Sequence, residues 1–229
     1  MAGRADKNSR MMAKKEQLLN ELRSAGIDNK RVLQAITDVP REAFVPRPFT
    51  EDAYENRALP IGEGQTISQP YVVALMTHAA HVESNHKVLE IGMGSGYQAA
   101  ILCKLVRRLF TIERYDNLRK KAEDKLHEIG IYNFSARTGD GSRGWPEQAP
   151  FDRIVVTAAS PEVPASLKNQ LADGGVMVIP IGDKDHDQRL VRITRNGDDF
   201  DTYELGPVRF VPLVGEEGVP DEGQRRHIS

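Results

Sequence analysis

One stretch decides the fold of this chain: Val88-Leu89-Glu90-Ile91-Gly92-Met93-Gly94-Ser95-Gly96. A short apolar run rich in branched side chains ends in three glycines at alternate positions, and apolar residues at helical spacing follow from Ala99. A strand, a glycine turn and a helix form the unit with which α/β proteins hold a nucleotide-like cofactor at the carboxyl end of a strand. Glycine suits the turn because a residue without Cβ lets the backbone approach a ligand and adopt positive φ.

The spacing of the glycines narrows the class of cofactor. A dinucleotide-binding turn has glycine at its first, third and sixth positions. Here the glycines are the first, third and fifth residues, and the sixth is Tyr97. This pattern disfavours a nicotinamide dehydrogenase and resembles the first motif of class I S-adenosylmethionine-dependent methyltransferases.

An acidic residue follows at a matching distance. The next apolar run ends in Glu113, which lies 21 residues after Gly92. An acidic residue about 20 residues beyond the glycine turn is placed to accept hydrogen bonds from ribose hydroxyls. The alternative is an ordinary strand-to-helix turn in which Glu113 only begins the next helix.

Strand and helix patterns alternate after residue 87, which favours an α/β fold with a doubly wound, mostly parallel, Rossmann-like sheet and helices on both faces. Asn196-Gly197 between two extended runs predicts a hairpin, so the sheet should end antiparallel. The expected strands are 87–91, 108–112, 132–138, 151–157, 176–181, 188–195 and 200–205, and the expected helices are 97–106, 116–129 and one near 164–172.

The remaining segments suggest one domain with attachments. Helices are expected from Met12 to Ala25 and after an N-cap at Asp28 or Asn29, followed by an ordered connection from Pro40 to Pro60. The predicted organisation is a disordered N-terminus at 1–11, an N-terminal helical segment with an active-site loop at 12–82, the cofactor-binding core at 83–214 and a flexible tail at 215–229.

Composition excludes several classes of protein. Apolar residues make up 39% of the 229 residues and charged residues 28%, which is ordinary for a globular domain. The net charge of −2 provides no basic field for nucleic acid. A single cysteine, the absence of a long apolar run and the absence of metal-ligand spacing predict a cytoplasmic protein with no membrane contact and no metal.

A second glycine pair follows the third expected strand. Gly139-Asp140-Gly141 should lie at the same sheet edge as the first turn, where Asp140 could accept a hydrogen bond from an adenine amino group. The alternative is an ordinary Asp-Gly turn. The fourth strand ends in Thr157-Ala158-Ala159-Ser160 rather than in the Asp/Asn-Pro-Pro-aromatic motif of enzymes that methylate DNA bases, which argues against a nucleic-acid substrate.

Ser68 has two interpretations. Two residues before Pro70 it could cap a helix. That role does not explain the whole string Gly64-Gln65-Thr66-Ile67-Ser68-Gln69-Pro70, which resembles the protein-L-isoaspartate (D-aspartate) O-methyltransferase family, bacterial members above all. Further matches are Val88 through Gln98, Gly139-Asp140-Gly141, Gly144-Trp145-Pro146, Ala149 through Asp152, Val156 through Ala159 and Val208 through Val214. Met93 and residues 215–229 depart from the family pattern.

The resemblance implies methyl transfer from S-adenosylmethionine to the free carboxyl of isoaspartyl residues in damaged peptides and proteins, whose ester then collapses to a succinimide. It also implies that Ser68 occupies the catalytic serine position of the family. We expect the protein to be a monomer. The cofactor would be held by Gln65, Thr66, Ile67, Gly92, Gly94, Ser95, Gly96, Glu113, Gly139 and Asp140.

The chemistry agrees with these residue types. A carboxyl group with a pKa of about 3.5–4 is ionised at neutral pH and needs no base, so the Ser68 hydroxyl need only orient it. Two rival functions remain open at this point: methylation of a different carboxylate substrate, and a non-catalytic protein that binds an adenosine ligand.

Overall fold

The computed structural model describes residues 2–183 and 187–221. Its centre is a seven-stranded sheet in the order β5-β4-β3-β6-β7-β8-β9. The first five strands in this order are parallel, whereas β8 and β9 are antiparallel, so the predicted fold class is confirmed. The strands are β3 (Lys87–Ile91), β4 (Arg108–Glu113), β5 (Phe134–Thr138), β6 (Phe151–Val156), β7 (Leu171–Ile181), β8 (Gln188–Asn196) and β9 (Asp199–Val208).

The helices enclose one face of this sheet more fully than the other. Alternate strand residues point to opposite faces. Val88 packs in one cluster with residues of the first five helices, and Leu89 packs in a second cluster with α6 and the C-terminal segment. The helices are α1 (Ala2–Ser24), α2 (Lys30–Asp38), α3 (Pro70–Ala79), α4 (Tyr97–Leu105), α5 (Asp116–Glu128) and α6 (Ala165–Asn169), with 3-10 turns η1 (Arg41–Phe44), η2 (Arg47–Asp52), η3 (Gly141–Arg143) and η4 (Pro146–Gln148).

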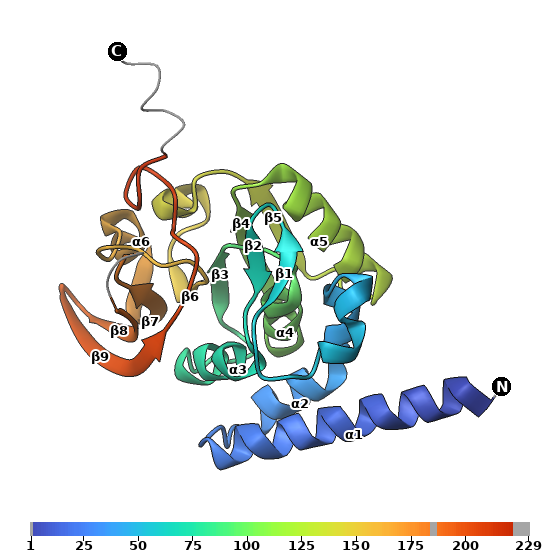
Figure 1. Ribbon diagram of the computed structural model, residues 1–229. Helices are drawn as coiled ribbons and strands as arrows, with labels where there is room; N and C mark the ends of the chain where they lie inside the picture. The colour runs from blue at the N-terminus through green and yellow to red at the C-terminus, as the bar shows by residue number, and fades with distance from the viewer. Residues whose placement is uncertain (1, 184–186, 222–229) are drawn as a thin grey trace.

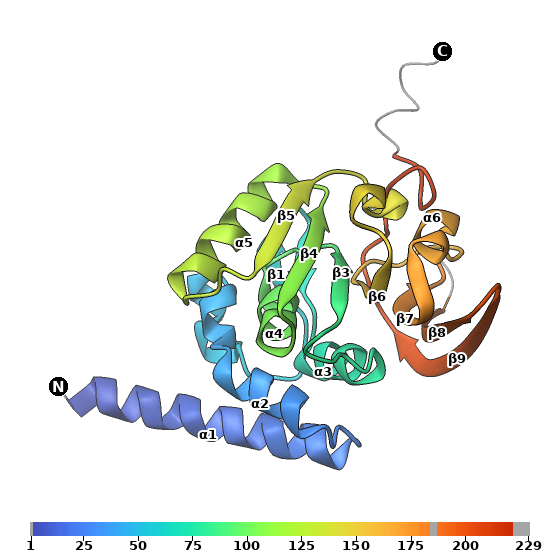
Figure 2. The same ribbon diagram turned by 180° about the vertical axis from the view of Figure 1, so that it is seen from behind.

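Both ends of the chain differ from the sequence prediction. Helix α1 begins at Ala2, where we expected a disordered segment up to residue 11, because alanine, arginine, lysine and methionine favour a helix there. It lies beside α2 at one end of the molecule (Figure 1 and, from behind, Figure 2). Residues 215–221 of the expected flexible tail fold back, since the Val219 amide donates to the Leu213 carbonyl at 2.7 Å. Residues 222–229 lie outside the described residues.

A hairpin that the sequence did not predict precedes α3. Strands β1 (Leu59–Gly62) and β2 (Gln65–Ile67) pair antiparallel, with Gly62 opposite Gln65. The two residues of the turn, Glu63 and Gly64, both have positive φ (51° and 66°), as a type I′ turn requires. The hairpin matters because it places Gln65, Thr66 and Ile67 beside the sheet edge.

Local signals elsewhere behave as the sequence predicts. The Asn29 side chain accepts hydrogen bonds from the Arg31 and Val32 amides, so Asn29 rather than Asp28 caps α2. The expected helix near 164–172 is shorter, because the chain enters β7 at Leu171. The pairing of β6 with β7 is irregular at its start, since Phe151 pairs with Leu171 but Arg153 pairs with Val176.

Candidate active site

A cleft opens between β3 and β6, where the strand order reverses direction. This is the position at which open α/β sheets bind ligands. Ile91 at the end of β3 and the following Gly92 line the cleft, as do Thr157 and Ala158, which follow β6. The remaining lining residues are Gln65, Thr66, Gly94, Ile112, Glu113, Arg114, Tyr115, Gly141, Val211, Pro212, Leu213 and Val214.

Gly92 shows why the first glycine of the turn is required. Its φ is 89°, and a Cβ atom on it would lie 2.4 Å from Thr157 Oγ1. The Thr157 hydroxyl donates a hydrogen bond of 2.6 Å to the Gly92 carbonyl, which fixes the turn against β6. The absence of a side chain therefore serves both the backbone conformation and the close approach of two strands.

Glu113 connects the ribose prediction to the glycine turn. Its carboxylate accepts hydrogen bonds from the Gly94 amide (2.8 Å) and from the Tyr115 amide (3.0 Å). The side chain is buried and lines the cleft. Each carboxylate oxygen has a second lone pair, so both oxygens can still accept from a ligand hydroxyl.

Ser68 lines a smaller cavity that adjoins the cleft, called here the Ser68 cavity. Helix α3 begins at Pro70 after Gln69, and no side-chain hydrogen bond caps it, so the capping interpretation of Ser68 is wrong. The cavity and the cleft share Thr66, Gly92, Gly94 and Thr157. The other residues that line the cavity are Ile67, Ser68, Val73, Met76, Met93, Ser95, Tyr97 and Gln98.

The structure brings together most of the residues that we predicted for the site, but three lie outside both cavities. Gly96 is the N-cap of α4 with φ of 87°, and a Cβ atom on it would lie 3.1 Å from Ala122 Cβ. The Gly139 amide donates to the Glu113 carbonyl at 3.0 Å. Asp140 does not line the cleft, although its neighbour Gly141 does. The contact of Asp140 with adenine therefore stays a prediction.

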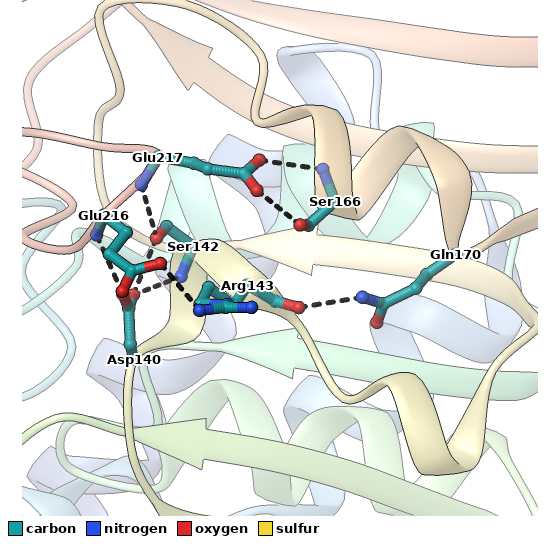
Figure 3. A network of polar contacts seen from close by, with 7 residues as sticks. All are labelled: Asp140, Ser142, Arg143, Ser166, Gln170, Glu216 and Glu217. Carbon is teal, nitrogen blue, oxygen red and sulfur yellow. Dashed lines mark hydrogen bonds and ion pairs between the residues drawn. The ribbon is translucent and has the colours of Figure 1, made fainter.

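Asp140 instead organises a polar network (Figure 3). Its Oδ1 accepts from the amide and hydroxyl of Ser142 at 2.9 and 2.7 Å, and its Oδ2 accepts from the Glu216 amide at 2.8 Å. Glu217 binds the amide of Ser166 at 2.8 Å and also the Ser166 hydroxyl. The two glutamates belong to residues 211–219, named here the C-terminal strap, whose first four residues line the cleft.

Several residues of the site were missed from the sequence. The strap was assigned to the core up to residue 214 and to a flexible tail beyond it, because Glu216 and Glu217 stand in a polar stretch without periodicity. Thr157 lies in the string from Val156 to Ala159, which carries part of the family resemblance, but the string alone does not indicate a role for the Thr157 side chain. Gln98 donates from Nε2 to Thr77 Oγ1 at 2.9 Å inside the core, a contact that sequence spacing does not reveal.

A buried carboxyl group lies next to the glycine turn. Glu90 on β3 is fully buried, and burial raises its pKa to about 8. The Thr111 hydroxyl lies 2.6 Å from its Oε2, and its Oε1 has no partner among the described residues. Glu90 is therefore mostly protonated at neutral pH and adds little negative charge next to the glycine turn.

Two classes of site receive no support within residues 2–183 and 187–221. This part of the chain has no cluster of three or more histidine, cysteine or acidic residues that could bind a metal ion. It also has no helix of the length and hydropathy that crossing a bilayer requires.

Residues 13–218 match the model of the family described as protein-L-isoaspartate (D-aspartate) O-methyltransferase. The chain belongs to this family. Because the match extends to residue 218, most of the C-terminal strap has a family counterpart, contrary to our expectation for residues beyond 214.

Individual relatives agree with the family assignment. A protein-L-isoaspartate O-methyltransferase of Parvibaculum lavamentivorans is 55% identical over 210 residues, which cover 91% of this chain and 94% of the relative. One solved protein-L-isoaspartate O-methyltransferase superposes with a TM-score of 0.81 at 28% identity, over 89% of this chain and 67% of that one. A Plasmodium falciparum protein assigned to the same activity, in complex with S-adenosyl-L-homocysteine, superposes with a TM-score of 0.76 at 25% identity, over 86% and 97%.

Proposed function

We propose that this protein transfers a methyl group from S-adenosyl-L-methionine to the free carboxyl of L-isoaspartyl and D-aspartyl residues in damaged peptides and proteins. One observation supports this most directly. The string from Gln65 to Ser68 forms a shared wall between a cleft with a glycine turn and a second cavity. A cofactor and an acceptor would therefore lie on either side of Thr66 and Gly94.

The residues of the cleft fit the cofactor. Gly92 and Gly94 have positive φ and present backbone without side chains, and Glu113 retains lone pairs for ribose hydroxyls. Ile91, Ile112 and Leu213 provide apolar surface for an adenine ring. When bound, S-adenosylmethionine supplies an electrophilic methyl group on a sulfonium centre.

The residues of the Ser68 cavity fit a carboxylate acceptor. Histidine, lysine, aspartate and glutamate are absent from the described residues that line it. Tyr97 has a buried hydroxyl whose pKa is raised by burial, so it does not act as a base. An acceptor that is already ionised needs no proton removed, and the Ser68 hydroxyl can hold one oxygen while the other remains nucleophilic. Alignment of two bound reactants can contribute roughly 7–11 kcal/mol to lowering the barrier.

The test is transfer of tritium from labelled cofactor to matched peptides. A peptide with one isoaspartyl residue should be methylated, whereas the same peptide with a normal aspartyl residue should not. Methylation of small carboxylic acids with neither peptide labelled would support a different carboxylate methyltransferase. Binding of the cofactor without any transfer would support a non-catalytic adenosine-ligand protein.

A monomeric, cytoplasmic enzyme without a nucleic-acid partner is part of the same proposal. The net charge of −2 supports the last point. Sedimentation at micromolar concentration should give the mass of one chain, and a dimer would contradict the expected oligomeric state.

A further inference from the structure

Arg41 is fully buried, which is rare for an arginine. It lies on η1 with an exposed fraction of 0%. Its Nε donates to the Ala53 carbonyl at 2.7 Å and its Nη2 donates to the Ser68 carbonyl at 2.7 Å. No carboxylate forms an ion pair with it within the described part of the chain, and its Nη1 is buried without a partner there. Arginine is almost never fully buried unless it is paired with an anion. A buried arginine without a counterion is therefore unusual.

The guanidinium contacts two residues that line the Ser68 cavity. Ser68 accepts the hydrogen bond through its backbone, and the Tyr97 ring centroid lies 4.7 Å from Arg41 Cζ. Both residues border the cavity in which the acceptor would bind. The uncompensated charge therefore lies directly behind the cavity wall.

The Ser68 carbonyl can transmit this charge to the Gln69 amide, because the N–H of a trans peptide points away from its carbonyl and therefore away from Arg41. The Ser68 carbonyl and the Gln69 amide belong to one planar peptide unit. A hydrogen bond from a cation to the carbonyl polarises the unit and makes its N–H a stronger donor. Neither the Gln69 amide nor the Ser68 hydroxyl forms a hydrogen bond with another of the described residues. Helix α3 begins at the next residue, and its N-terminal dipole adds positive potential.

We propose that Arg41 is a positioning residue that acts through the Ser68–Gln69 peptide to bind the substrate carboxylate. This inference rests on the proposed function. The carboxylate becomes the missing counterion, held by the Gln69 amide and the Ser68 hydroxyl rather than by the guanidinium itself. The indirect contact has a chemical advantage. A direct ion pair would withdraw electron density from the attacking oxygen, whereas a polarised peptide attracts the anion and leaves that oxygen nucleophilic.

Loss of Arg41 should have different effects on KM and on kcat. The carboxylate loses its negative charge as the ester forms, so Arg41 stabilises the bound substrate at least as much as the transition state. Replacing it should mainly raise KM for the isoaspartyl peptide. The cofactor cleft does not include Arg41, so the dissociation constant of S-adenosylhomocysteine should change less than about twofold.

The test compares wild type, Arg41→Met and Arg41→Lys. Each is assayed with an isoaspartyl peptide as substrate and with the matching isoasparaginyl peptide, whose carboxamide is neutral, as a competitive inhibitor. We expect KM for the isoaspartyl peptide to rise at least tenfold in Arg41→Met and less in Arg41→Lys, which keeps the charge. We also expect the preference for the charged peptide over the neutral one to fall toward unity in Arg41→Met. Arg31→Met is the matched control, because Arg31 donates to the carbonyls of Val82 and Leu105 away from the cleft.

A purely structural role would give a different result. It would lower the melting temperature of Arg41→Met and leave the ratio of the two peptide affinities unchanged, which would overturn the proposal. The wild type tests it even if Arg41→Met does not fold, since equal affinity of wild type for the charged and neutral peptides would also overturn it. Absence of methyl transfer by the wild type would instead contradict the proposed function.

Discussion

The Glu113 carboxylate accepts a hydrogen bond from the Gly94 amide at 2.8 Å, so the acidic residue that ends β4 also holds the glycine turn that follows β3. A single side chain thereby connects the two sequence signals that indicated the cofactor. A substitution of Glu113 should consequently affect both the binding of the ribose and the conformation of the glycine turn.

Replacing Glu113 should weaken cofactor binding without abolishing the fold. In Glu113→Ala the Gly94 amide loses its acceptor and the ribose hydroxyls lose theirs. Hydrogen bonds to a charged group are worth about 1.5–3 kcal/mol each, so we expect the dissociation constant of S-adenosylhomocysteine to rise at least tenfold. Isothermal titration calorimetry measures it, with the exposed Glu128→Ala as control. An unaltered constant would remove Glu113 from the ribose.

Ser68→Ala should slow turnover and preserve cofactor affinity. The hydroxyl is free of a helix-capping role, so its loss should act on the acceptor rather than on stability. A hydrogen bond to a carboxylate of about 1.5–3 kcal/mol predicts turnover roughly ten- to hundredfold slower. Steady-state kinetics with an isoaspartyl peptide measures this, and unchanged kinetics would show that Ser68 does not contact the substrate.

Gly92→Ala should destabilise the protein more than Gly197→Ala. Both glycines have positive φ, but a Cβ atom meets Thr157 Oγ1 at 2.4 Å only at position 92 and finds open space at position 197. Backbone strain of about 1–2 kcal/mol is common to both, and the clash adds about 1–3 kcal/mol at Gly92. Urea denaturation measures the free energy of unfolding. Equal losses of stability in the two variants would mean that the Thr157 side chain rotates away from the new methyl group at no cost in free energy.

Glu217→Ala should accelerate release of the bound cofactor product. Glu217 fixes the C-terminal strap by accepting from the Ser166 amide and hydroxyl, and its own amide donates to Ser142 Oγ at 3.0 Å. Freeing the strap should raise the dissociation rate of S-adenosylhomocysteine severalfold in stopped-flow fluorescence.

Glu216→Ala is the matched control for the strap. It removes only the exposed ion pair with Arg143, and exposed pairs of this kind contribute about 0–1 kcal/mol. Identical dissociation rates for the Glu217 variant and wild type would contradict the role of the strap.

Glu90 should make stability depend on pH with an unusual sign. Burial raises its pKa from 4.5 to about 8. Between these values the folded state holds a proton that the unfolded state has released, so the free energy of unfolding falls as pH rises, by on the order of 1 kcal/mol per pH unit. Glu90→Gln cannot ionise. It should resemble wild type near pH 5 and be more stable than wild type at pH 8, as measured by urea midpoints. A parallel pH dependence of both proteins would contradict this.

Local chemistry explains what the sequence could predict. The glycine turn, Glu113 and the alternation of strands and helices are short-range signals, and each lies where the fold requires it. The capping role of Asn29 is also local. The hairpin before α3 was missed because its turn places Glu63 at positive φ, which glutamate does not signal.

Long-range contacts account for the rest. Glu217 and Ser166 are 51 residues apart, and nothing in their neighbourhoods indicates that they meet. Asp140 was assigned to adenine on its position at the sheet edge, yet the fold brings the Glu216 amide to its carboxylate. Arg41 on η1 and Ser68 in the segment before α3 are likewise 27 residues apart and meet only in the folded chain.

The most direct measurement of the central claim is a crystal structure with S-adenosylhomocysteine and an isoaspartyl peptide. We predict that the adenosyl group lies in the cleft between β3 and β6, with the Glu113 carboxylate within hydrogen-bond distance of the ribose hydroxyls. We also predict that the peptide carboxylate lies at the Ser68 hydroxyl and the Gln69 amide. A product bound outside the cleft, or a carboxylate distant from Ser68, would contradict the proposed function.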